Sequence, residues 1–265
     1  MSRPAPAERV SVPSRVVLVD KPAGCTSFDV VRRVKRGLSD KVGHAGTLDP
    51  FATGLLIVLV GQATRISSLL MELPKEYAVR LQFGASSTTG DPDGIITETG
   101  GSVEATDVVR ALDRFRGVIT QKVPMTSAVK VAGERLYKKA HRGEEVETPE
   151  REVSIYDLTM VGFDPRTQAA DLVAGVSKGT YVRRLAQDIG ESLGVSAYAS
   201  GLRRTRVGAL CVDDATPPEA VGPARLRETD AGCLAVSTAL AYLPSVTLAG
   251  AKAVQVGVGA PSWRG

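Results

Sequence analysis

The sequence predicts a mixed α+β protein, in which helices are inserted between the strands of a sheet. The chain has 265 residues, enough to bury a sizeable core without disulfides or metals. Hydrophobic residues make up 43% and charged residues 23%, a balance typical of ordinary globular proteins. Short apolar runs alternate with helical patterns in no strict βαβ order, and no internal repeat is visible. Together these observations favour one large domain with something smaller attached.

The first quarter of the chain predicts two strands separated by a helix and a loop. Residues 16–19 form a β-branched run closed by Asp20-Lys21-Pro22, which is typical of a buried strand ending in a turn. Ser27 is the candidate N-cap of a helix whose apolar residues repeat at helical spacing as far as residue 38. Residues 39–50 have no periodicity and predict a loop, which leads into a buried strand over residues 55–60.

The remaining patterns predict four strands, three helices and one turn. Alternating or continuous apolar runs indicate the strands, apolar stripes at helical spacing indicate the helices, and an Asp-Pro-Asp-Gly sequence indicates the turn. In chain order these are strand 76–83, turn 91–94, helix 107–115, helix 133–141, strands 153–161 and 168–176, helix 182–193 and extended residues 202–212.

The composition changes after residue 212, where prolines and alanines become frequent. We therefore place the main domain at residues 15–212, between a flexible N-terminus of residues 1–14 and a short C-terminal segment of residues 213–265. The N-terminus has no apolar segment, and no stretch reaches the roughly 18 apolar residues of a membrane span. The three cysteines are far apart and odd in number, which favours a reducing compartment. We expect a cytoplasmic protein that does not contact a membrane.

Positive charge is clustered along the chain, although the net charge is only +4. Basic runs lie at residues 32–36, 135–142 and 203–206. Clustered cations favour a polyanionic partner such as nucleic acid, whereas each run taken alone is equally compatible with one solvated face of a helix or strand.

The sequence lacks the motifs of several cofactor-dependent enzyme classes. Its two histidines, His44 and His141, have no second His or Cys at ligand spacing. The glycine-rich motifs that bind dinucleotides or nucleotide phosphates do not occur, and neither does the nucleophile elbow of hydrolases. We therefore expect a protein that uses no cofactor and no metal.

The most informative segment is residues 43–54, GHAGTLDPFATG. Its Asp49 precedes a proline in a glycine-rich loop that leads into the buried strand, so the carboxylate is held on a stiff backbone and faces outward. An isolated Leu-Asp-Pro tripeptide more often marks a helical turn capped by the aspartate. The complete segment, however, resembles the loop that carries the catalytic aspartate in the TruB family of bacterial tRNA pseudouridine-55 synthases.

The resemblance covers roughly residues 15–212, with its motifs in family order. It implies the pseudouridine synthase fold, with a mixed, mainly antiparallel sheet and inserted helices. Family members commonly end in a small RNA-binding domain of the PUA type, and residues 243–248 resemble only its opening. The C-terminal segment is therefore expected to be too short for a complete domain of that type. The further matching segments are residues 20–24, 26–27, 75–77, 124–130, 135–137, 177–183 and 202–205.

The resemblance implies a catalytic group of three residues. Asp49 takes the role of the ionised carboxylate that acts on the target uridine. Burial would raise the pKa of this carboxylate, and the family match assigns the opposing cation to Arg183, whose guanidinium can bind both carboxylate oxygens. Tyr77 resembles the tyrosine that stacks on the uracil and is a candidate for proton transfer at C5. Without the family, Arg183 would be taken for a surface cation and Tyr77 for a core aromatic residue.

Seven further positions match substrate-binding or RNA-binding positions of the family. His44 resembles the histidine that fills the space left by the flipped base. Tyr181 and Leu202 match residues that line the pocket of that base, and Lys21 matches a residue close to the catalytic loop. The others lie in motif segments expected to contact the RNA. The complete set is Lys21, Gly43, His44, Asp91, Lys130, Tyr181 and Leu202.

The leading functional hypothesis is an isomerase that flips uridine 55 out of the tRNA T-loop and converts it to pseudouridine. This conversion breaks the N1–C1′ bond and joins C5 to C1′ without redox change or group transfer, so it needs no cofactor. Asp49 could attack C1′, attack C6, or remove a proton at C2′, and the sequence leaves these routes open. The implied partner is the T-arm of tRNA, bound by a monomer without a protein partner.

Two alternatives use the same scaffold. The first is an RNA-binding or tRNA-folding module without turnover, and the combination of Asp49 with Arg183 favours the enzyme because a pure binder has no use for a carboxylate near phosphates. The second is a guide-RNA-dependent synthase of the archaeal and eukaryotic type, which shares the aspartate loop. The compact chain and residues 126–130 favour the stand-alone bacterial form.

Overall fold

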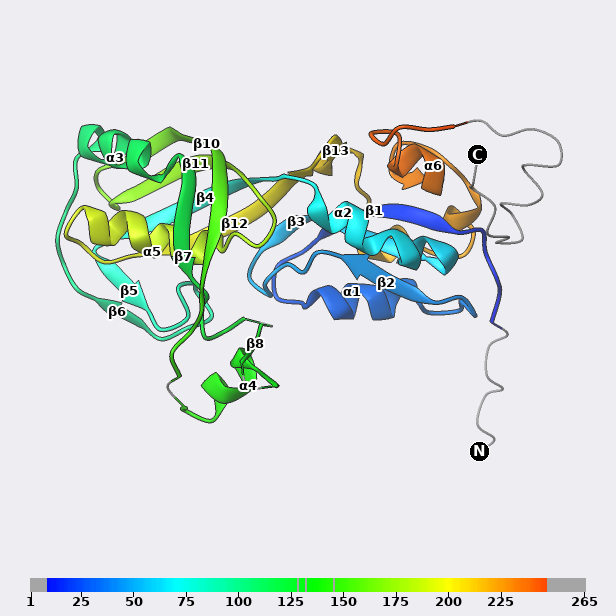
Figure 1. Ribbon diagram of the computed structural model, residues 1–265, viewed down its shortest axis with the longest axis horizontal. Helices are drawn as coiled ribbons and strands as arrows, with labels where there is room; N and C mark the ends of the chain where they lie inside the picture. The colour runs from blue at the N-terminus through cyan, green and yellow to red at the C-terminus, as the bar shows by residue number, and fades with distance from the viewer. Residues whose placement is uncertain (1–8, 128, 132, 145, 247–265) are drawn as a thin grey trace, which may run out of the picture.

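A ten-stranded sheet organises the residues that the computed structural model describes, 9–127, 129–131, 133–144 and 146–246 (Figure 1). Two small hairpins stand outside this sheet, and six α-helices and several 3-10 turns are inserted between strands. The strands of the sheet are β1 (Arg15–Lys21), β2 (Val42–Ala45), β3 (Thr53–Val60), β4 (Lys75–Phe83), β7 (Gly117–Lys122), β10 (Glu150–Asp164), β11 (Ala169–Val176), β12 (Ala197–Val207), β13 (Leu210–Cys211) and β14 (Cys233–Leu234).

The hairpins are β5 (Ala85–Ser87) with β6 (Ile96–Glu98), and β8 (Lys130–Val131) with β9 (Glu134–Arg135). The helices are α1 (Ser27–Val34), α2 (Ser67–Glu72), α3 (Ala105–Leu112), α4 (Leu136–His141), α5 (Val182–Ser192) and α6 (Val236–Ala239). The 3-10 helices are η1 (Gly61–Ile66), η2 (Asp113–Phe115), η3 (Val212–Asp214), η4 (Pro218–Ala220) and η5 (Arg225–Arg227).

The main strand order is β14-β1-β3-β12-β4-β11-β10-β7, with β2 and β13 paired to β3 and β12 beside this path. Each described pairing in the sheet is antiparallel except that of β12 with β3. The predicted α+β architecture with a mixed, mainly antiparallel sheet is therefore confirmed.

The sheet is covered on both faces around β3. Side chains alternate between the two faces of a strand, and in β3 both sets are apolar and fully buried. Leu56 and Val58 belong to the larger core, which also contains residues of α1 and α5. Leu55 and Ile57 belong to a second core with residues of α2 and α6. This double burial explains why the segment is a continuous apolar run.

The half of the sheet beyond β12 is covered on one face only. In β4, Val79 and Leu81 are buried in the larger core, whereas Ala78 and Arg80 are exposed on the opposite face. Figure 1 shows α3 and α5 beside these strands. This one-sided burial produces the alternating pattern that predicted the strand.

The two halves of the sheet meet at a short parallel pairing between β12 and β3. Arg203 pairs with Thr53, and Arg204 pairs with Gly54. Gly54 has a φ of 99°, and a Cβ atom there would lie 2.3 Å from the carbonyl oxygen of Arg204. A glycine is therefore required at this joint. The loop between β2 and β3, which contains Asp49, enters the sheet directly before it.

Three predictions for the first helix and its following loop are wrong. The N-cap is Thr26 rather than Ser27, because the Thr26 side chain and Asp29 form a reciprocal capping box. The helix ends at Val34, and residues 39–50 are not wholly a loop, since β2 pairs with β3 inside that range. The four residues of β2 are too few to produce a detectable alternation.

Two further boundaries also differ from the predictions. The helix predicted at residues 133–141 begins at Leu136, because residues 134–135 form β9. The extended segment predicted from residue 202 begins at Ala197. The strand β7, at the edge of the sheet, was not predicted, and its Val118 is exposed.

Residues 213–246 return to the sheet already described. β14 pairs with β1, with Val16 opposite Leu234, and Leu226 lies in the larger core. The predicted flexible N-terminus, residues 1–14, and the predicted PUA-like opening, residues 243–248, fall partly outside the described residues. Among the described helices, none has the length and apolar character needed to cross a membrane.

Candidate active site

Asp49 lies in the loop that connects β2 to β3, close to the joint between the two halves of the sheet. The amide of Ala52 donates to the carbonyl oxygen of Asp49 at 3.1 Å, which closes a tight turn. The Leu-Asp-Pro segment is thus a turn at a strand entrance. The Asp49 side chain keeps 34% of its surface exposed, so solvent and a substrate can reach it.

Side chains from β1, α1 and β12 hold the backbone of this loop. Lys21 is fully buried, and its Nζ donates to the carbonyl oxygen of Pro50 at 3.1 Å and to two carbonyls of its own turn. Ser27 Oγ exchanges hydrogen bonds with both the amide and the carbonyl of Leu48. The loop is therefore fixed on both sides of Asp49.

Arg204 anchors the beginning of the same loop from β12. Its side chain is 1% exposed and donates to the carbonyl oxygens of Gly46, Thr47 and Leu55, at 3.0, 3.4 and 2.8 Å. Burial lowers the pKa of Lys21, and the positive charge of Arg204 lowers it further. These two buried cations satisfy backbone carbonyls that the irregular loop would otherwise leave unpaired.

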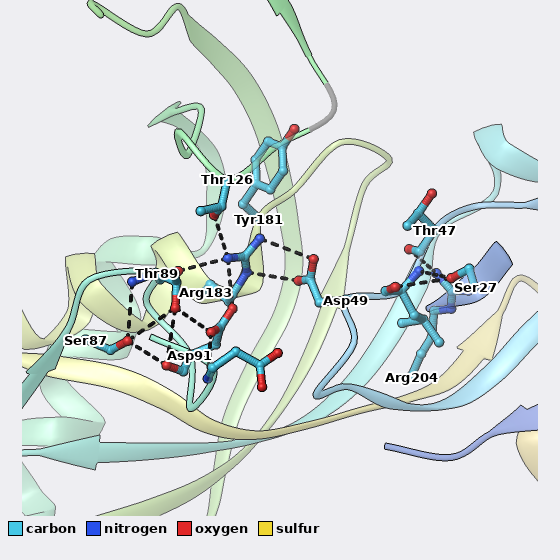
Figure 2. Close-up of polar contacts among 12 residues, drawn as sticks. Ser27, Thr47, Asp49, Ser87, Thr89, Asp91, Thr126, Tyr181, Arg183 and Arg204 are labelled. Carbon is cyan, nitrogen blue, oxygen red and sulfur yellow. Dashed lines mark hydrogen bonds and ion pairs between the residues drawn. The ribbon is translucent and has the colours of Figure 1, made fainter. Parts of the chain in front are cut away.

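The carboxylate of Asp49 forms a two-point ion pair with Arg183 (Figure 2). The distances are 2.9 Å from Nε to Oδ2 and 3.2 Å from Nη2 to Oδ1. Arg183 is the second residue of α5, and its side chain is 5% exposed. The guanidinium plane thus fixes both the charge and the direction of the carboxylate.

The third nitrogen of Arg183 is held by a turn that precedes β6. Nη1 donates to Asp91 Oδ2 at 2.9 Å and to the carbonyl oxygen of Thr89 at 2.8 Å. Asp91 is 5% exposed and also accepts from Thr89 Oγ1 and from the amide of Asp93. Figure 2 shows Arg183 between the two carboxylates, with Asp49 on the side away from this turn.

The pKa of Asp49 is raised above its ordinary value of 3.8, chiefly because burial disfavours the charged form. Arg183 opposes this shift, and the negative charge of Asp91 adds to it. One arginine faces two carboxylates, so it stabilises each of them less than a dedicated partner would. The result is an ionisable, oriented carboxylate that can act as a nucleophile or as a base.

His44 lies on β2, opposite Val58 of β3, with its ring half-buried. Its Nδ1 is buried and has no hydrogen-bond partner among the described residues. Burial and the nearby charge of Arg204 lower the pKa of His44, which keeps the ring neutral at pH 7. Gly43 precedes it on the same strand and pairs with Leu59.

The structure places Tyr77 on β4 and Tyr181 at the start of α5. Tyr77 pairs with Arg204 of β12 and packs against the larger core. Tyr181 is the residue before α5, and its ring lies 5.4 Å from the guanidinium of Arg151. Figure 2 shows the Tyr181 ring next to Arg183 and directed away from its ion pair with Asp49.

A cavity of about 610 Å³ opens beside the Asp49 loop. Phe51 from that loop lines it, together with Thr53 at the start of β3 and Asp93 from the turn near Arg183. Leu202, which is 9% exposed, is the one predicted base-pocket residue on its wall. The cavity is large enough for a pyrimidine nucleotide.

Lys130 lies apart from these residues. It is exposed in the β8–β9 hairpin, opposite Arg135, within an insertion between β7 and β10. Among the described residues, no group of three His, Cys, Asp or Glu side chains is placed to hold a metal. The described cysteines Cys25, Cys211 and Cys233 are free thiols.

Three residues at this site were not identified from the sequence. They are Ser27 and Arg204, which hold the loop, and Thr126, whose hydroxyl accepts from Arg183 Nη1 at 2.8 Å. Ser27 and Thr126 lie inside matched motifs, and Arg204 lies inside a basic run. Neither signal specifies a backbone carbonyl or a guanidinium as the partner, because those contacts arise only on folding.

Comparison with known proteins places the chain among pseudouridine synthases. Residues 33–182 match the family model described as TruB family pseudouridylate synthase (N terminal domain). A protein of Aquifex aeolicus (strain VF5) named tRNA pseudouridine synthase B is 42% identical over 77% of this chain and 71% of its own length. A protein of the same name from Thermobifida fusca (strain YX) is 46% identical over 76% of this chain and 71% of its own length.

Solved structures show the same fold. A chain in the crystal structure of a Cbf5-Nop10-Gar1 complex matches 80% of this chain, with a TM-score of 0.61 and 30% identity. A chain in the structure of an H/ACA RNP bound to a substrate RNA containing 2′-deoxyuridine matches 87%, with a TM-score of 0.62 and 25% identity. The chain spans 53% and 62% of the lengths of these two structural relatives.

Proposed function

Because the chain belongs to the TruB family of pseudouridylate synthases, we propose that it converts a uridine of tRNA to pseudouridine and that this uridine is position 55 of the T-loop. The observation that carries the proposal is the two-point ion pair between Asp49 and Arg183. It presents an oriented carboxylate on a loop whose Phe51 lines a cavity of about 610 Å³, and an isomerisation without a cofactor needs such a carboxylate.

The reaction breaks the N1–C1′ bond of the nucleoside and joins C5 of the same uracil to C1′. The C5 proton leaves and N1 gains a proton, so no redox change or group transfer occurs. Asp49 supplies the ionised carboxylate, whether it attacks C1′ or C6 or removes a proton at C2′. Arg183 keeps that carboxylate charged and directed. We assign Tyr77 to stacking on the uracil, with its hydroxyl as the candidate for proton transfer at C5.

The target base must leave its stack before a carboxylate can reach it, at a cost of a few kcal/mol. We assign His44 to the space that the base vacates. Its ring is held neutral by burial and by Arg204, so it can stack without an additional desolvation cost. Leu202 and Tyr181 are assigned to the wall of the base pocket, and Leu202 already lines the described cavity.

The partner is the tRNA T-arm, contacted by Lys130 among others. We also propose that the protein acts as a monomer in the cytoplasm without a protein partner. Both carboxylates and the arginine between them belong to one chain, which supports a monomer. The described cysteines are free, which agrees with a reducing compartment. Light scattering during gel filtration tests the monomer, since a dimer mass would contradict it.

Release of tritium from C5 of labelled uridine tests the reaction. The substrate is a T-arm stem-loop, and its matched control carries cytidine in place of uridine 55. We expect stoichiometric release by the wild type, and a loss of at least a thousandfold with Asp49→Asn while RNA binding is retained. Asp107→Asn, in an exposed turn of α3, is the control variant and is expected to retain the wild-type rate.

The alternative function is an RNA-binding or tRNA-folding module without turnover. Tight binding of the T-arm by wild type and Asp49→Asn, with no tritium release by either, would favour that module. Release from the RNA that lacks uridine 55 would instead assign the reaction to a different position.

A further inference from the structure

The insertion between β7 and β10 begins directly beside the active site. The amide of Val123 donates to the carbonyl oxygen of Pro149 at 3.0 Å and closes its base. The insertion contains the β8–β9 hairpin and α4, which project from the body of the protein (Figure 1). Thr126 lies near this base, in the same segment as the predicted RNA contact Lys130.

Thr126 contacts the arginine that holds Asp49. Its Oγ1 accepts a hydrogen bond from Arg183 Nη1 at 2.8 Å. Figure 2 shows Thr126 on one side of the guanidinium and Asp91 on the other. The arginine is therefore held from two directions by segments that are distant in the sequence.

The hydrogen count at Nη1 makes this contact informative. The nitrogen carries two hydrogens, whereas three acceptors lie within 2.9 Å: Thr89 O, Asp91 Oδ2 and Thr126 Oγ1. Two of these acceptors come from one turn, and the Thr126 hydroxyl is the third. Loss of that hydroxyl leaves enough acceptors to satisfy Nη1 but removes the restraint on the side opposite Asp91.

We propose that Thr126 is a positioning residue, through which the insertion sets the orientation of Arg183 and thereby the direction and charge of the Asp49 carboxylate. The inference rests on the proposed function and adds a coupling to it. Lys130 and Arg135 of the hairpin are exposed cations suited to RNA phosphates. RNA that binds this hairpin also fixes the base of the insertion and with it the position of Thr126. The hydrogen bond between Thr126 and Arg183 then passes this change to the active site.

Three variants separate this role from a general effect on the insertion. Thr126→Val removes the hydroxyl and keeps the shape, Thr126→Ser keeps the hydroxyl, and Thr148→Val makes the same change at a part-exposed threonine of the insertion. With saturating enzyme, we expect Thr126→Val to slow single-turnover isomerisation roughly three- to tenfold. Its dissociation constant for the RNA should change less than twofold. Thr126→Ser should restore the rate, and Thr148→Val should not alter it.

The pH dependence of the rate distinguishes this positioning role from a purely structural one. A less restrained Arg183 stabilises the charged form of Asp49 less, so the pKa of Asp49 rises and the acid limb of the rate profile moves to higher pH. We expect this movement in Thr126→Val and not in Thr126→Ser. Weaker RNA binding by Thr126→Val with an unchanged single-turnover rate would overturn the proposal and make Thr126 an RNA contact.

A measurement without RNA keeps the inference separate from the proposed function. The carboxyl carbon of Asp49 is followed by 13C NMR titration and identified by its absence in Asp49→Asn. We expect a higher Asp49 pKa in Thr126→Val than in wild type, Thr126→Ser and Thr148→Val. Equal values in all four proteins would overturn the positioning role, whether or not the protein forms pseudouridine.

Discussion

At the scale of single residues, Arg183 joins two carboxylates that reach it from different parts of the chain. It binds both oxygens of Asp49 through Nε and Nη2, and binds Asp91 through Nη1. Three nitrogens at fixed angles are needed to make these contacts simultaneously. A lysine carries one ammonium group and cannot reproduce them.

The first prediction concerns this geometry. Arg183→Lys should lower the single-turnover rate by roughly a hundredfold with little change in RNA affinity, because the positive charge stays but the two-point contact is lost. Arg184→Lys is the matched control, since the neighbouring arginine forms its ion pairs, within the described part of the chain, with Asp188 and Glu191 of its own helix. Its rate should remain within about twofold of wild type. Equal rates for Arg183→Lys and wild type would show that charge alone suffices.

The second prediction follows from the raised pKa of Asp49. The reaction needs the ionised carboxylate, and a raised pKa means that protonation begins at a higher pH than for an ordinary aspartate. Activity should therefore fall on acidification with an apparent pKa above 3.8, and should be constant above that limb until another group titrates. A pH profile of the single-turnover rate measures this. A limb at or below 3.8, in protein shown to be folded, would contradict it.

Sequence motifs predict the catalytic pair but not the contacts around it. Asp49 and Arg183 can be paired from the sequence alone, because the family resemblance assigns both positions. Asp91 is expected from the sequence to contact RNA, and the structure instead shows it 2.9 Å from Arg183 and 5% exposed. Thr126 is not identified by its motif, since the partner of a hydroxyl depends on how distant segments pack. Motifs indicate which residues matter and do not give their contacts.

At the scale of elements, the joint between β12 and β3 sets the position of the catalytic loop. Two residue pairs make this joint, and Arg204 uses its backbone there while its side chain reaches Gly46 and Thr47. The loop and the joint are thus tied to the same residue. A change in the backbone at this point should alter both.

The third prediction tests the joint. Gly54→Ala should destabilise the protein by roughly 3 kcal/mol or more, because its φ of 99° is unfavourable for alanine and its Cβ would overlap the carbonyl oxygen of Arg204. Gly194→Ala has a φ of 74° with no atom within 4 Å of the new Cβ. It should cost only about 1 kcal/mol. Urea unfolding compares the two, and equal losses would mean that the contact with β12 adds nothing.

The strands of this joint differ in how far the sequence predicts them. β3 is predictable because burial on both faces requires a continuous apolar run. The position of β12 between β3 and β4 is not predictable, since a parallel contact of two residue pairs across a long sequence separation leaves no local pattern. β2 also leaves no local pattern, so its segment is predicted to be a loop. Its pairing with β3, and not its own sequence, makes it a strand.

At the scale of the whole molecule, the fold places an insertion with exposed cations beside the site that holds Asp49 and Asp91. Lys130 and Arg135 are exposed on its hairpin, whereas Arg142 is engaged by Glu134 and Glu144. Among the insertion residues whose side chains are described, Lys130 and Arg135 are therefore the cations free to replace counterions on RNA phosphates.

The fourth prediction concerns the salt dependence of RNA binding. The affinity for a T-arm RNA should fall steeply as salt increases, and the double variant Lys130→Gln and Arg135→Gln should reduce the slope of log K against log[salt] by about 1.5. Arg110→Gln, on α3, is the control and should leave the slope unchanged. Filter binding over a range of salt concentrations measures it. A double variant with the wild-type slope would place the RNA elsewhere.

During synthesis on the ribosome, β3 and β4 emerge long before the strand that lies between them. About 120 residues separate the end of β4 from the end of β12, which corresponds to roughly 6–25 s at ordinary rates of translation. Until then Asp49 exists without the β12 arginine that holds its loop, and for most of that time without Arg183. A product truncated before residue 204 would therefore carry the reactive aspartate on an unsupported loop. Such a fragment should be inert rather than partly active, so the order of the strands delays catalysis until most of the chain has been made.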